Sequence, residues 1–225
     1  MGKLIVIEGV DCSGKETQSK LLIEKLNKMG YNAKVLSYPN YSSPACGAVN
    51  MYLNGEFGEN ASDINPYSSS LFFAVDRIAS FYKDWKSEYD NTDTIFIADR
   101  YTTSNWIHQA SKFKNKIDSF KFINFSKNLE YELCELPKPD KVLFLSVPFE
   151  IIKELKNIRM NKIHNSNNLD IHEINETYLK SSHLKANEIA MIEKWDKINC
   201  ELDNTSLRTI EDISNEILKK IKEII

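Results

Sequence analysis

The sequence predicts an α/β fold of three layers, in which helices cover both faces of a five-stranded parallel sheet. Three observations lead to this prediction. Short runs of apolar and β-branched residues alternate with longer stretches of helical spacing. Most of the short runs are continuously apolar, as strands are when both faces of their sheet are buried. All seven glycines lie at or before Gly58, which confines the tight turns to the N-terminal quarter.

The apolar runs predict five strands. In chain order they are Leu4–Glu8, Ala33–Tyr38, Thr94–Ala98, Lys141–Val147 and Lys197–Leu202. Because a helical stretch lies between successive runs, we expect parallel βαβ units.

Helical spacing predicts the elements that connect these strands. In the first, Leu22, Leu26 and Met29 share one face and Gly30 follows, which is typical of a C-terminal cap. The later helices are expected at about Tyr67–Lys86, Ser119–Cys134, Phe149–Asn161, Ile174–Lys194 and Ile210–Ile224. No linker is long enough to separate two domains, so residues 1–225 are expected to form one.

The charge balance excludes some classes of protein. The chain has 29 Lys+Arg against 32 Asp+Glu, a formal net charge of −3. This balance argues against binding of nucleic acid or anionic membrane through bulk electrostatics. The 42% of hydrophobic residues excludes a disordered chain. Arginine is scarce, and the four arginines are Arg77, Arg100, Arg159 and Arg208.

The N-terminus and the cysteines predict a compartment. The apolar stretch before Glu8 is too short for a signal-peptide core, and no run reaches the roughly 18 apolar residues of a membrane helix. The cysteines are widely spaced and form no CxxC pair; they are Cys12, Cys46, Cys134 and Cys200. We therefore expect reduced thiols in a cytoplasmic protein.

The strongest local signal is the segment Gly9–Thr17, which follows the first strand and opens the first helix. Gly9 and Gly14 permit a backbone that turns successive N–H groups into one concavity. The helix N-terminus adds partial positive charge, and Lys15 can reach the outer phosphates of a nucleotide. The alternative is a chance GxxxxGK pattern, which the strand–loop–helix context disfavours. The segment is predicted to be a phosphate-binding loop.

Two carboxylates are candidates for a magnesium site. Glu16 stands where a Ser or Thr usually follows the lysine; it could bind Mg²⁺, or turn to solvent and leave the metal to other oxygens. Asp99 ends a buried strand and is well placed to hold Mg²⁺ or its water shell. Arg100, next to it, can clamp a phosphate with two hydrogen bonds. The alternative for Asp99 and Arg100 is a structural ion pair.

Four motifs occur in order along the chain. They are Ile7–Gln18, a Phe-x-x-x-Arg pattern at Phe73–Arg77, Asp99–Asn105 followed by Gln109, and Leu136–Leu145. Together they resemble the thymidylate kinases, a family of P-loop nucleoside monophosphate kinases, over nearly the whole chain. The resemblance implies a P-loop NTPase fold with a lid at about 153–172. It also implies transfer of the γ-phosphate of ATP to dTMP for dTTP biosynthesis, with Mg²⁺ as cofactor, and a homodimer. The apolar, aromatic helix Leu71–Trp85 is a candidate contributor to the dimer interface.

The resemblance also implies roles for individual residues. Phe73 would stack on thymine, Arg77 would donate to a base carbonyl and Asp11 would hold the sugar 3′-hydroxyl. Residues implied in ATP binding are Gly9, Val10, Asp11, Cys12, Ser13, Gly14, Lys15, Glu16 and Thr17. Those implied in dTMP binding are Asp11, Tyr38, Pro39, Phe73, Arg77, Arg100, Ser104, Asn105 and Gln109. The catalytic set is Lys15, Arg100, Arg159 and Asp11.

Some positions depart from the family pattern and keep alternatives open. Cys12 leaves the phosphate loop without the cation that some members carry there, so Arg159 is predicted as the lid cation; the alternative is a solvated basic helix face. The segment Ser37–Tyr41 lacks the usual arginine for the acceptor phosphate, and His108 replaces a tyrosine that crowds a ribose 2′-hydroxyl in some relatives. A kinase for dUMP or UMP remains an alternative. Glu16 keeps open a non-catalytic nucleotide-binding regulator.

Overall fold

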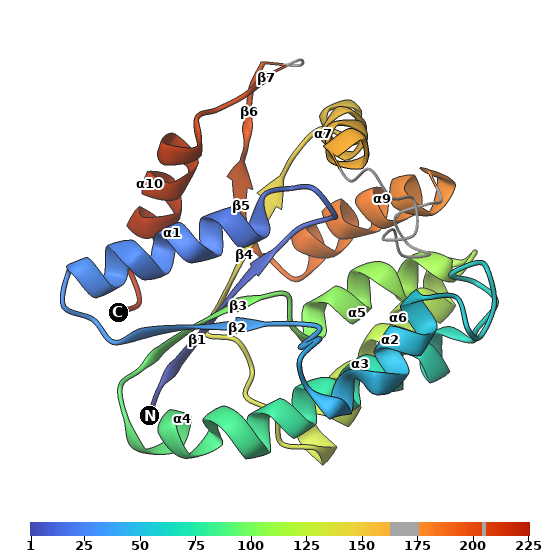
Figure 1. Cartoon of the computed structure of the whole chain (residues 1–225), viewed down its shortest axis with the longest axis horizontal. Coiled ribbons are helices and arrows are strands. Elements are labelled where there is room, and N and C mark those ends of the chain that lie inside the picture. The colour runs from blue at the N-terminus through green and yellow to red at the C-terminus, as the bar shows by residue number, and fades with distance from the viewer. Residues whose placement is uncertain (163–175, 204–205) are drawn as a thin grey trace.

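The computed structural model describes residues 1–162, 176–203 and 206–225, without the side chains of 160–162. Five parallel strands form one sheet in the order β2-β3-β1-β4-β5 (Figure 1). Their bounds are Lys3–Glu8 (β1), Ala33–Ser37 (β2), Ile95–Asp99 (β3), Lys141–Ser146 (β4) and Asp196–Asn199 (β5). The predicted five-stranded parallel sheet is confirmed.

The fifth strand is shorter than predicted. It was expected to reach Leu202, but it leaves the sheet after Asn199. The chain continues into a two-stranded antiparallel sheet of β6 (Glu201–Asp203) and β7 (Ser206–Leu207). Leu202 is 72% exposed there. The predicted boundary was wrong because Leu202 is apolar without being buried.

Both faces of the central strand are buried. Leu4 and Val6 pack in one apolar cluster with Trp85 on one side of the sheet, whereas Ile5 and Ile7 belong to another. Successive strand residues point to opposite faces. An alternating polar pattern is absent because helices cover both sides, as the continuous apolar runs predicted.

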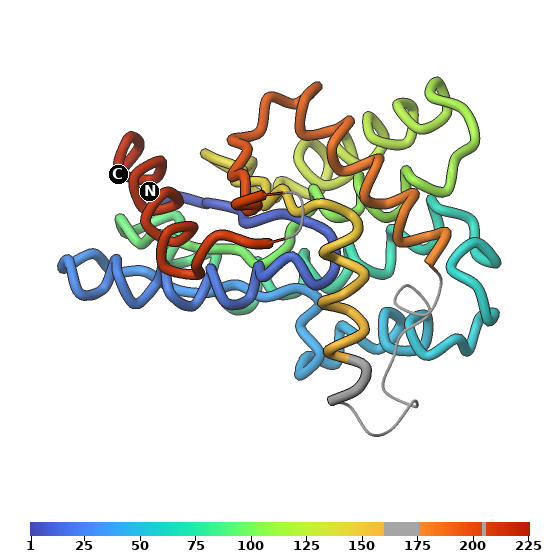
Figure 2. Tube along the Cα trace, turned by 90° about the horizontal axis from the view of Figure 1, so that it is seen from above, coloured from blue at the N-terminus to red at the C-terminus, as the bar shows by residue number. Residues whose placement is uncertain are grey.

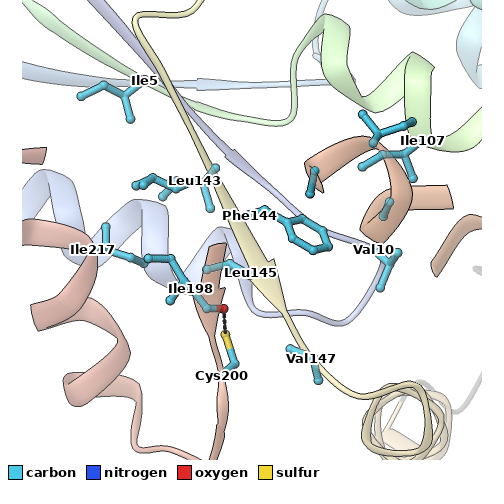
Figure 3. Packing of buried hydrophobic residues seen from close by; sticks show 14 of the residues in the cluster. Ile5, Val10, Ile107, Leu143, Phe144, Leu145, Val147, Ile198, Cys200 and Ile217 are labelled. Carbon is cyan, nitrogen blue, oxygen red and sulfur yellow. Dashed lines mark hydrogen bonds between the residues drawn. The ribbon is translucent and has the colours of Figure 1, made fainter. Parts of the chain in front are cut away.

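Helices α1 (Lys15–Lys28) and α10 (Ile210–Ile221) cover one face and pack against each other (Figure 1). Figure 3 shows the neighbouring core, where Leu143, Ile198 and Ile217 lie together. The Gln18 amide donates to the Ile210 carbonyl over 3.0 Å and fixes the start of α10.

The other face carries the remaining helices of the central part of the chain and α9 (Figure 1). They are α3 (Pro66–Ser80), the π-helix η2 (Phe81–Trp85), α4 (Lys86–Asn91), α5 (Thr102–His108), α6 (Lys116–Lys127), the π-helix η4 (Asn128–Leu133) and α9 (Glu176–Ile192). The predicted helices Tyr67–Lys86 and Ser119–Cys134 thus each contain a π-helical segment near their C-terminal end. None of the helices in the described ranges is both long and apolar enough to span a bilayer.

Short helical segments were missed by the sequence prediction. They are η1 (Pro44–Cys46), α2 (Gly47–Leu53), α5 and η3 (Ala110–Lys112). α5 shows the reason: its polar Thr103, Asn105 and His108 are as buried as its Trp106 and Ile107. A helix whose polar and apolar residues are equally buried has no amphipathic period to detect.

Helix α7 (Phe149–Lys162) lies beyond the carboxyl edge of the sheet, next to the loop between β1 and α1 (Figures 1 and 2). It corresponds to the predicted helix Phe149–Asn161. The predicted lid begins in α7, and its larger part, 163–172, lies outside the described residues.

Candidate active site

A cavity of about 1000 Å³ opens at the carboxyl edge of the sheet. The β1–α1 loop, the ends of β2 and β3, and helices α3, α5 and α7 all contribute to its wall. The predicted site residues that line it are Asp11, Cys12, Gly14, Lys15, Glu16, Thr17, Tyr38, Pro39, Phe73, Arg77, Asp99, Arg100, Ser104, Asn105, Gln109 and Arg159. Gly9, Val10 and Ser13 are not part of the lining, and Val10 and Ser13 are buried.

The loop between β1 and α1 is tightly folded. Cys12 and Gly14 adopt left-handed conformations with φ of 63° and 87°. A Cβ atom on Gly9 would lie 2.5 Å from Ser13 Oγ, so the loop closes only around a glycine. Among the described residues, no side chain caps the N-terminus of α1. Its first N–H groups are therefore left for an anion in the cavity.

Lys15 is buried at the start of α1. Its Nζ donates to the Val10 carbonyl over 2.6 Å and lies 3.4 Å from Ser13 Oγ. Burial, together with the positive charge of Arg100, lowers the pKa of Lys15 to about 8. The lysine is thus held over the loop, and an anion in the cavity would favour its charged form.

Arg100 follows β3 directly, in a left-handed conformation with φ 66°. Such a conformation is costly for a non-glycine residue and is often found at functional sites. Its guanidinium forms an ion pair with Asp11 of the phosphate loop. The alternative of an ion pair with the neighbouring Asp99 is therefore not what the geometry shows. Arg100 and Asp11 together join the ends of β1 and β3.

A buried carboxylate lies beneath these groups. Glu8 accepts hydrogen bonds from Thr103 Oγ1 over 2.6 Å and from Ser104 Oγ over 2.9 Å. Burial raises the pKa of Glu8. Ser104 lines the cavity, but its hydroxyl serves this internal contact. Glu8 thus ties α5 to the strand that carries the phosphate loop, a role that the sequence reasoning missed.

Helices α3 and α5 form another part of the cavity wall. Phe73 packs edge-on against Tyr52, with ring centroids 6.0 Å apart. Gln109 Oε1 accepts from Ser69 Oγ over 2.7 Å, while its buried Nε2 has no partner in the described part of the chain. An unsatisfied buried donor of this kind is costly unless a ligand or water completes it.

Arg77 does not lie free in this wall. It is 2% exposed and forms a two-bond ion pair with Glu130 of η4, over 2.7 Å and 2.9 Å. Asn105 Nδ2 donates to the Ser70 carbonyl and to the same Glu130 carboxylate. Glu130 was not predicted, because it lies 53 residues from Arg77 and belongs to none of the recognised motifs.

In the segment after β2, the Tyr38 hydroxyl is already hydrogen-bonded within the protein. Tyr38 Oη donates to Ser80 Oγ and accepts from Trp85 Nε1, each over 3.2 Å. Burial raises the pKa of Tyr38 to about 12. The backbone N–H of Asn40 donates to buried Asp76 over 2.8 Å. Tyr38 and Pro39 therefore wall the cavity mainly through their rings.

The two candidate magnesium ligands have different settings. The Glu16 side chain is 74% exposed and pairs with Lys20 over 2.6 Å, and this hydrogen bond lowers the pKa of Glu16. Asp99 lies at the end of β3 and faces the cavity together with Lys15. The described residues contain no group of three or more His, Cys, Asp or Glu that could hold a metal. One or two carboxylates suit Mg²⁺ that is bound mainly by phosphates and water.

Comparisons with known proteins agree on one family. A family model described as thymidylate kinase matches residues 7–217. The human thymidylate kinase is 31% identical over 156 residues, which cover 65% of this chain and 61% of that protein. The Mycobacterium tuberculosis thymidylate kinase is also 31% identical, over 67% of this chain and 69% of its own length. A probable thymidylate kinase of Methanococcus aeolicus is 26% identical over 99% of this chain and 97% of its own.

A solved structure extends the likeness to the fold. The thymidylate kinase of Candida albicans superposes with a TM-score of 0.71 at 22% identity, over 99% of this chain and 92% of its own. The aligned part spans less than two thirds of the human relative's length.

Proposed function

The chain belongs to the thymidylate kinase family, and from this premise we propose that it transfers the γ-phosphate of ATP to dTMP, giving dTDP and ADP. One observation carries the proposal. A single cavity is lined by residues of the phosphate loop, including Lys15, by Phe73 and Arg77, and by Arg100. In-line phosphoryl transfer requires such positioning of donor and acceptor, with cations where they meet.

The phosphate loop is the proposed ATP site. The uncapped N-terminus of α1 and the buried Lys15 supply positive charge to the β- and γ-phosphates. The nine residues Gly9–Thr17 form this site, and Thr17 is proposed to contact the α-phosphate. Gly9, Val10 and Ser13 serve it through their backbone, since they lie behind the cavity wall.

The wall of α3 and α5 is the proposed dTMP site. The Phe73 ring offers a stacking surface for a pyrimidine. Arg77 and Asn105 contribute polar groups for the base edge, and Ser104 and Gln109 complete the pocket. We assign the sugar 3′-hydroxyl to Asp11, which lines the same cavity.

Arg100 and Arg159 are proposed to stabilise the transferred phosphoryl group. Arg100 is paired with Asp11 and can bridge donor and acceptor phosphates. Arg159 lines the cavity from α7; besides the hydrogen bond and charge of Lys20, its own charge helps to lower the pKa of Glu16 at the phosphate loop. The attacking oxygen is already a phosphate anion, so the reaction requires no general base.

Magnesium is the proposed cofactor, with ATP. When bound, it would neutralise charge on the β- and γ-phosphates. Asp99 is the better placed of the two candidate residues, because Glu16 is engaged with Lys20 at the surface.

Few cationic side chains are available to bind the phosphate of the acceptor nucleotide. The segment Ser37–Tyr41 contains none. Among the described residues that line the cavity, the lysines and arginines are Lys15, Arg77, Arg100 and Arg159. Since Arg77 is paired with Glu130, we assign the acceptor phosphate to Arg100.

We also propose a cytoplasmic homodimer formed of one domain per chain. Helix α3 and the adjoining η2 expose an apolar stripe of Leu71, Val75 and Tyr82, which are 42%, 53% and 51% exposed. Their spacing places them on one helical face. The four cysteines are free thiols, as is usual in a reducing compartment. Sedimentation of the wild type and of Val75→Glu tests this proposal. The wild type should sediment as a dimer, and the variant as a monomer.

A coupled assay of ADP release tests the activity. The acceptors are dTMP, dUMP, UMP, dCMP, AMP and GMP, each with ATP and Mg²⁺. The expected result is the highest kcat/KM with dTMP. Higher kcat/KM with dUMP or UMP would identify the alternative pyrimidine kinase. If ATP binds but no acceptor leads to the release of ADP, the protein would be a non-catalytic regulator instead.

A further inference from the structure

We propose that Glu130 is a positioning residue that sets which pyrimidine base the pocket accepts. The inference rests on the proposed function, because it concerns the base of the acceptor nucleotide. Glu130 is 1% exposed and lies in the π-helix η4, a form that is rare and tends to occur at functional sites. It does not line the cavity itself.

The Glu130 carboxylate fixes the orientation of Arg77. Arg77 Nε donates to Oε2 over 2.7 Å, and Nη2 donates to Oε1 over 2.9 Å. These bonds occupy one edge of the planar guanidinium. Nη1 makes no hydrogen bond to any described residue, and Arg77 lines the cavity. The base edge therefore meets a hydrogen-bond donor at this point.

The same carboxylate fixes the orientation of the Asn105 amide. Asn105 has two acceptors beside it, the Ser70 carbonyl at 3.2 Å and Glu130 Oε1 at 3.3 Å. Only the NH₂ group of the amide can donate to two acceptors, so Nδ2 must face them. Because Asn105 lines the cavity, its Oδ1 is the atom left for a ligand. The base edge therefore meets an acceptor beside the donor of Arg77.

This donor–acceptor pair matches one class of base. Thymine and uracil present a carbonyl at C4 and an N–H at N3, which suit Arg77 and Asn105 Oδ1 respectively. Cytosine presents an amino group at C4 and an unprotonated N3, so donor would meet donor and acceptor would meet acceptor. A site built around buried polar groups rejects a mismatched ligand strongly, because those groups are left unpaired.

The burial of the pair supports a role in recognition. A buried ion pair is often no more stabilising than apolar residues of the same volume. Ser126 Oγ also donates to Glu130 Oε1 over 3.3 Å, and Trp106 Nε1 donates to Ser126 Oγ over 3.1 Å. A network of this kind holds one arrangement of side chains against others.

Replacing the carboxylate by an amide tests the inference. Glu130→Gln keeps the shape but can present an N–H to Asn105, which frees the Asn105 amide to turn its Nδ2 toward the base. We expect the dTMP-to-dCMP ratio of kcat/KM to fall at least tenfold, mainly through a higher KM for dTMP. Glu132→Gln is the matched control, since Glu132 is an exposed residue of the same helix paired with Lys138. It should leave the ratio unchanged.

A second variant separates specificity from folding. Glu130→Asp keeps an acceptor for Asn105 with a shorter reach to Arg77, so kcat/KM for dTMP should fall while the preference over dCMP persists. Circular dichroism and ATP binding would show which variants are folded. A folded Glu130→Gln with the wild-type ratio, or loss of preference in folded Glu130→Asp, would overturn the inference. An inactive wild type would instead overturn the proposed function.

Discussion

His108 Nε2 lies 3.1 Å from Arg100 Nη1, inside the proposed active site. Because an arginine can only donate, the imidazole Nε2 accepts and its proton is assigned to Nδ1, which lies 3.4 Å from Tyr178 Oη. Burial, with the nearby positive charges of Arg100 and Lys15, lowers the pKa of His108 to about 3. His108 is therefore neutral at physiological pH and orients Arg100 without adding charge.

The neutral His108 predicts a pH dependence of stability. Between pH 6.5 and about 3, the unfolded chain binds a proton at His108 that the folded chain does not. His108 therefore lowers the free energy of unfolding as the pH falls through this window, by at most about 1.4 kcal/mol per pH unit, and has no such effect above 6.5. Urea unfolding at pH 7.5 and pH 5 should show a smaller loss for His108→Gln than for the wild type. Equal losses would mean that His108 is protonated in the folded state.

The buried Lys15 predicts a pH dependence of ATP binding. Its pKa of about 8 means that the free protein loses the lysine charge above that pH. ATP binds the charged form, so affinity should be constant from pH 7 to 8 and then weaken by up to about tenfold per pH unit. Titration calorimetry at pH 7.5 and 9.5 measures this. Lys15→Met should bind ATP more weakly and show no such decline; a decline of the same size in Lys15→Met would assign the effect elsewhere.

Cys12 is predicted to be a reactive thiol that ATP protects. It lines the cavity at the N-terminus of a helix, where a thiolate is stabilised. Burial raises the pKa of Cys46 and of Cys200 to about 12, so these thiols should react slowly. Mass spectrometry after brief treatment with iodoacetamide measures each site, and alkylation of Cys12 should abolish activity. Cys134 lies outside the cavity and is the internal control. Identical rates at Cys12 with and without ATP would refute the prediction.

Arg159 is predicted to supply charge to the transferred phosphoryl group. Arg159→Ala should lower kcat at least about tenfold, which corresponds to about 1.4 kcal/mol of transition-state stabilisation, and should change KM for dTMP little. Lys156→Ala provides the control, because Lys156 belongs to the same helix but not to the cavity lining. A loss of less than tenfold for Arg159→Ala would indicate that another cation acts at this point.

Asp99 and Glu16 are predicted to differ in their effect on magnesium dependence. Asp99→Asn should raise the Mg²⁺ concentration for half-maximal activity by about tenfold or more, since a carboxylate that faces the phosphates is lost. Glu16→Gln should change it less than twofold, because Glu16 pairs with Lys20 at the surface. Activity measured at fixed ATP over a range of Mg²⁺ compares the two. A larger shift for Glu16→Gln would reverse the assignment.

The sheet could be predicted from the sequence because its strands are buried on both faces and read as continuous apolar runs. The phosphate loop could be predicted because the residues that form it are close in sequence: Gly9, Gly14 and Lys15 occupy fixed positions in one short segment. By contrast, α5 carries its polar residues inward, so no pattern marks it. Its Thr103 and Ser104 donate to Glu8, which only the folded chain brings near them.

The partners of the predicted residues were harder to foresee. The family resemblance proposes Arg77 for the base, but its pairing with Glu130 could not be predicted, since η4 approaches α3 only in the folded protein. The sequence likewise left open whether Glu16 binds Mg²⁺ or turns to solvent. The exposure of Glu16 follows from helix geometry, which turns its side chain toward Lys20 one turn later.

The register of the sheet fixes how the phosphate loop and Arg100 are spaced. Ile7 of β1 pairs with Asp99 of β3, so the phosphate loop and Arg100 both begin just beyond neighbouring strands. Their separation is set by the distance between hydrogen-bonded strands, about 4.8 Å. The proposed base site lies on α3 and α5, with Glu130 of η4 behind it. Substitutions in those helices can therefore change the preferred nucleotide while the spacing of the groups that act on the phosphates stays the same.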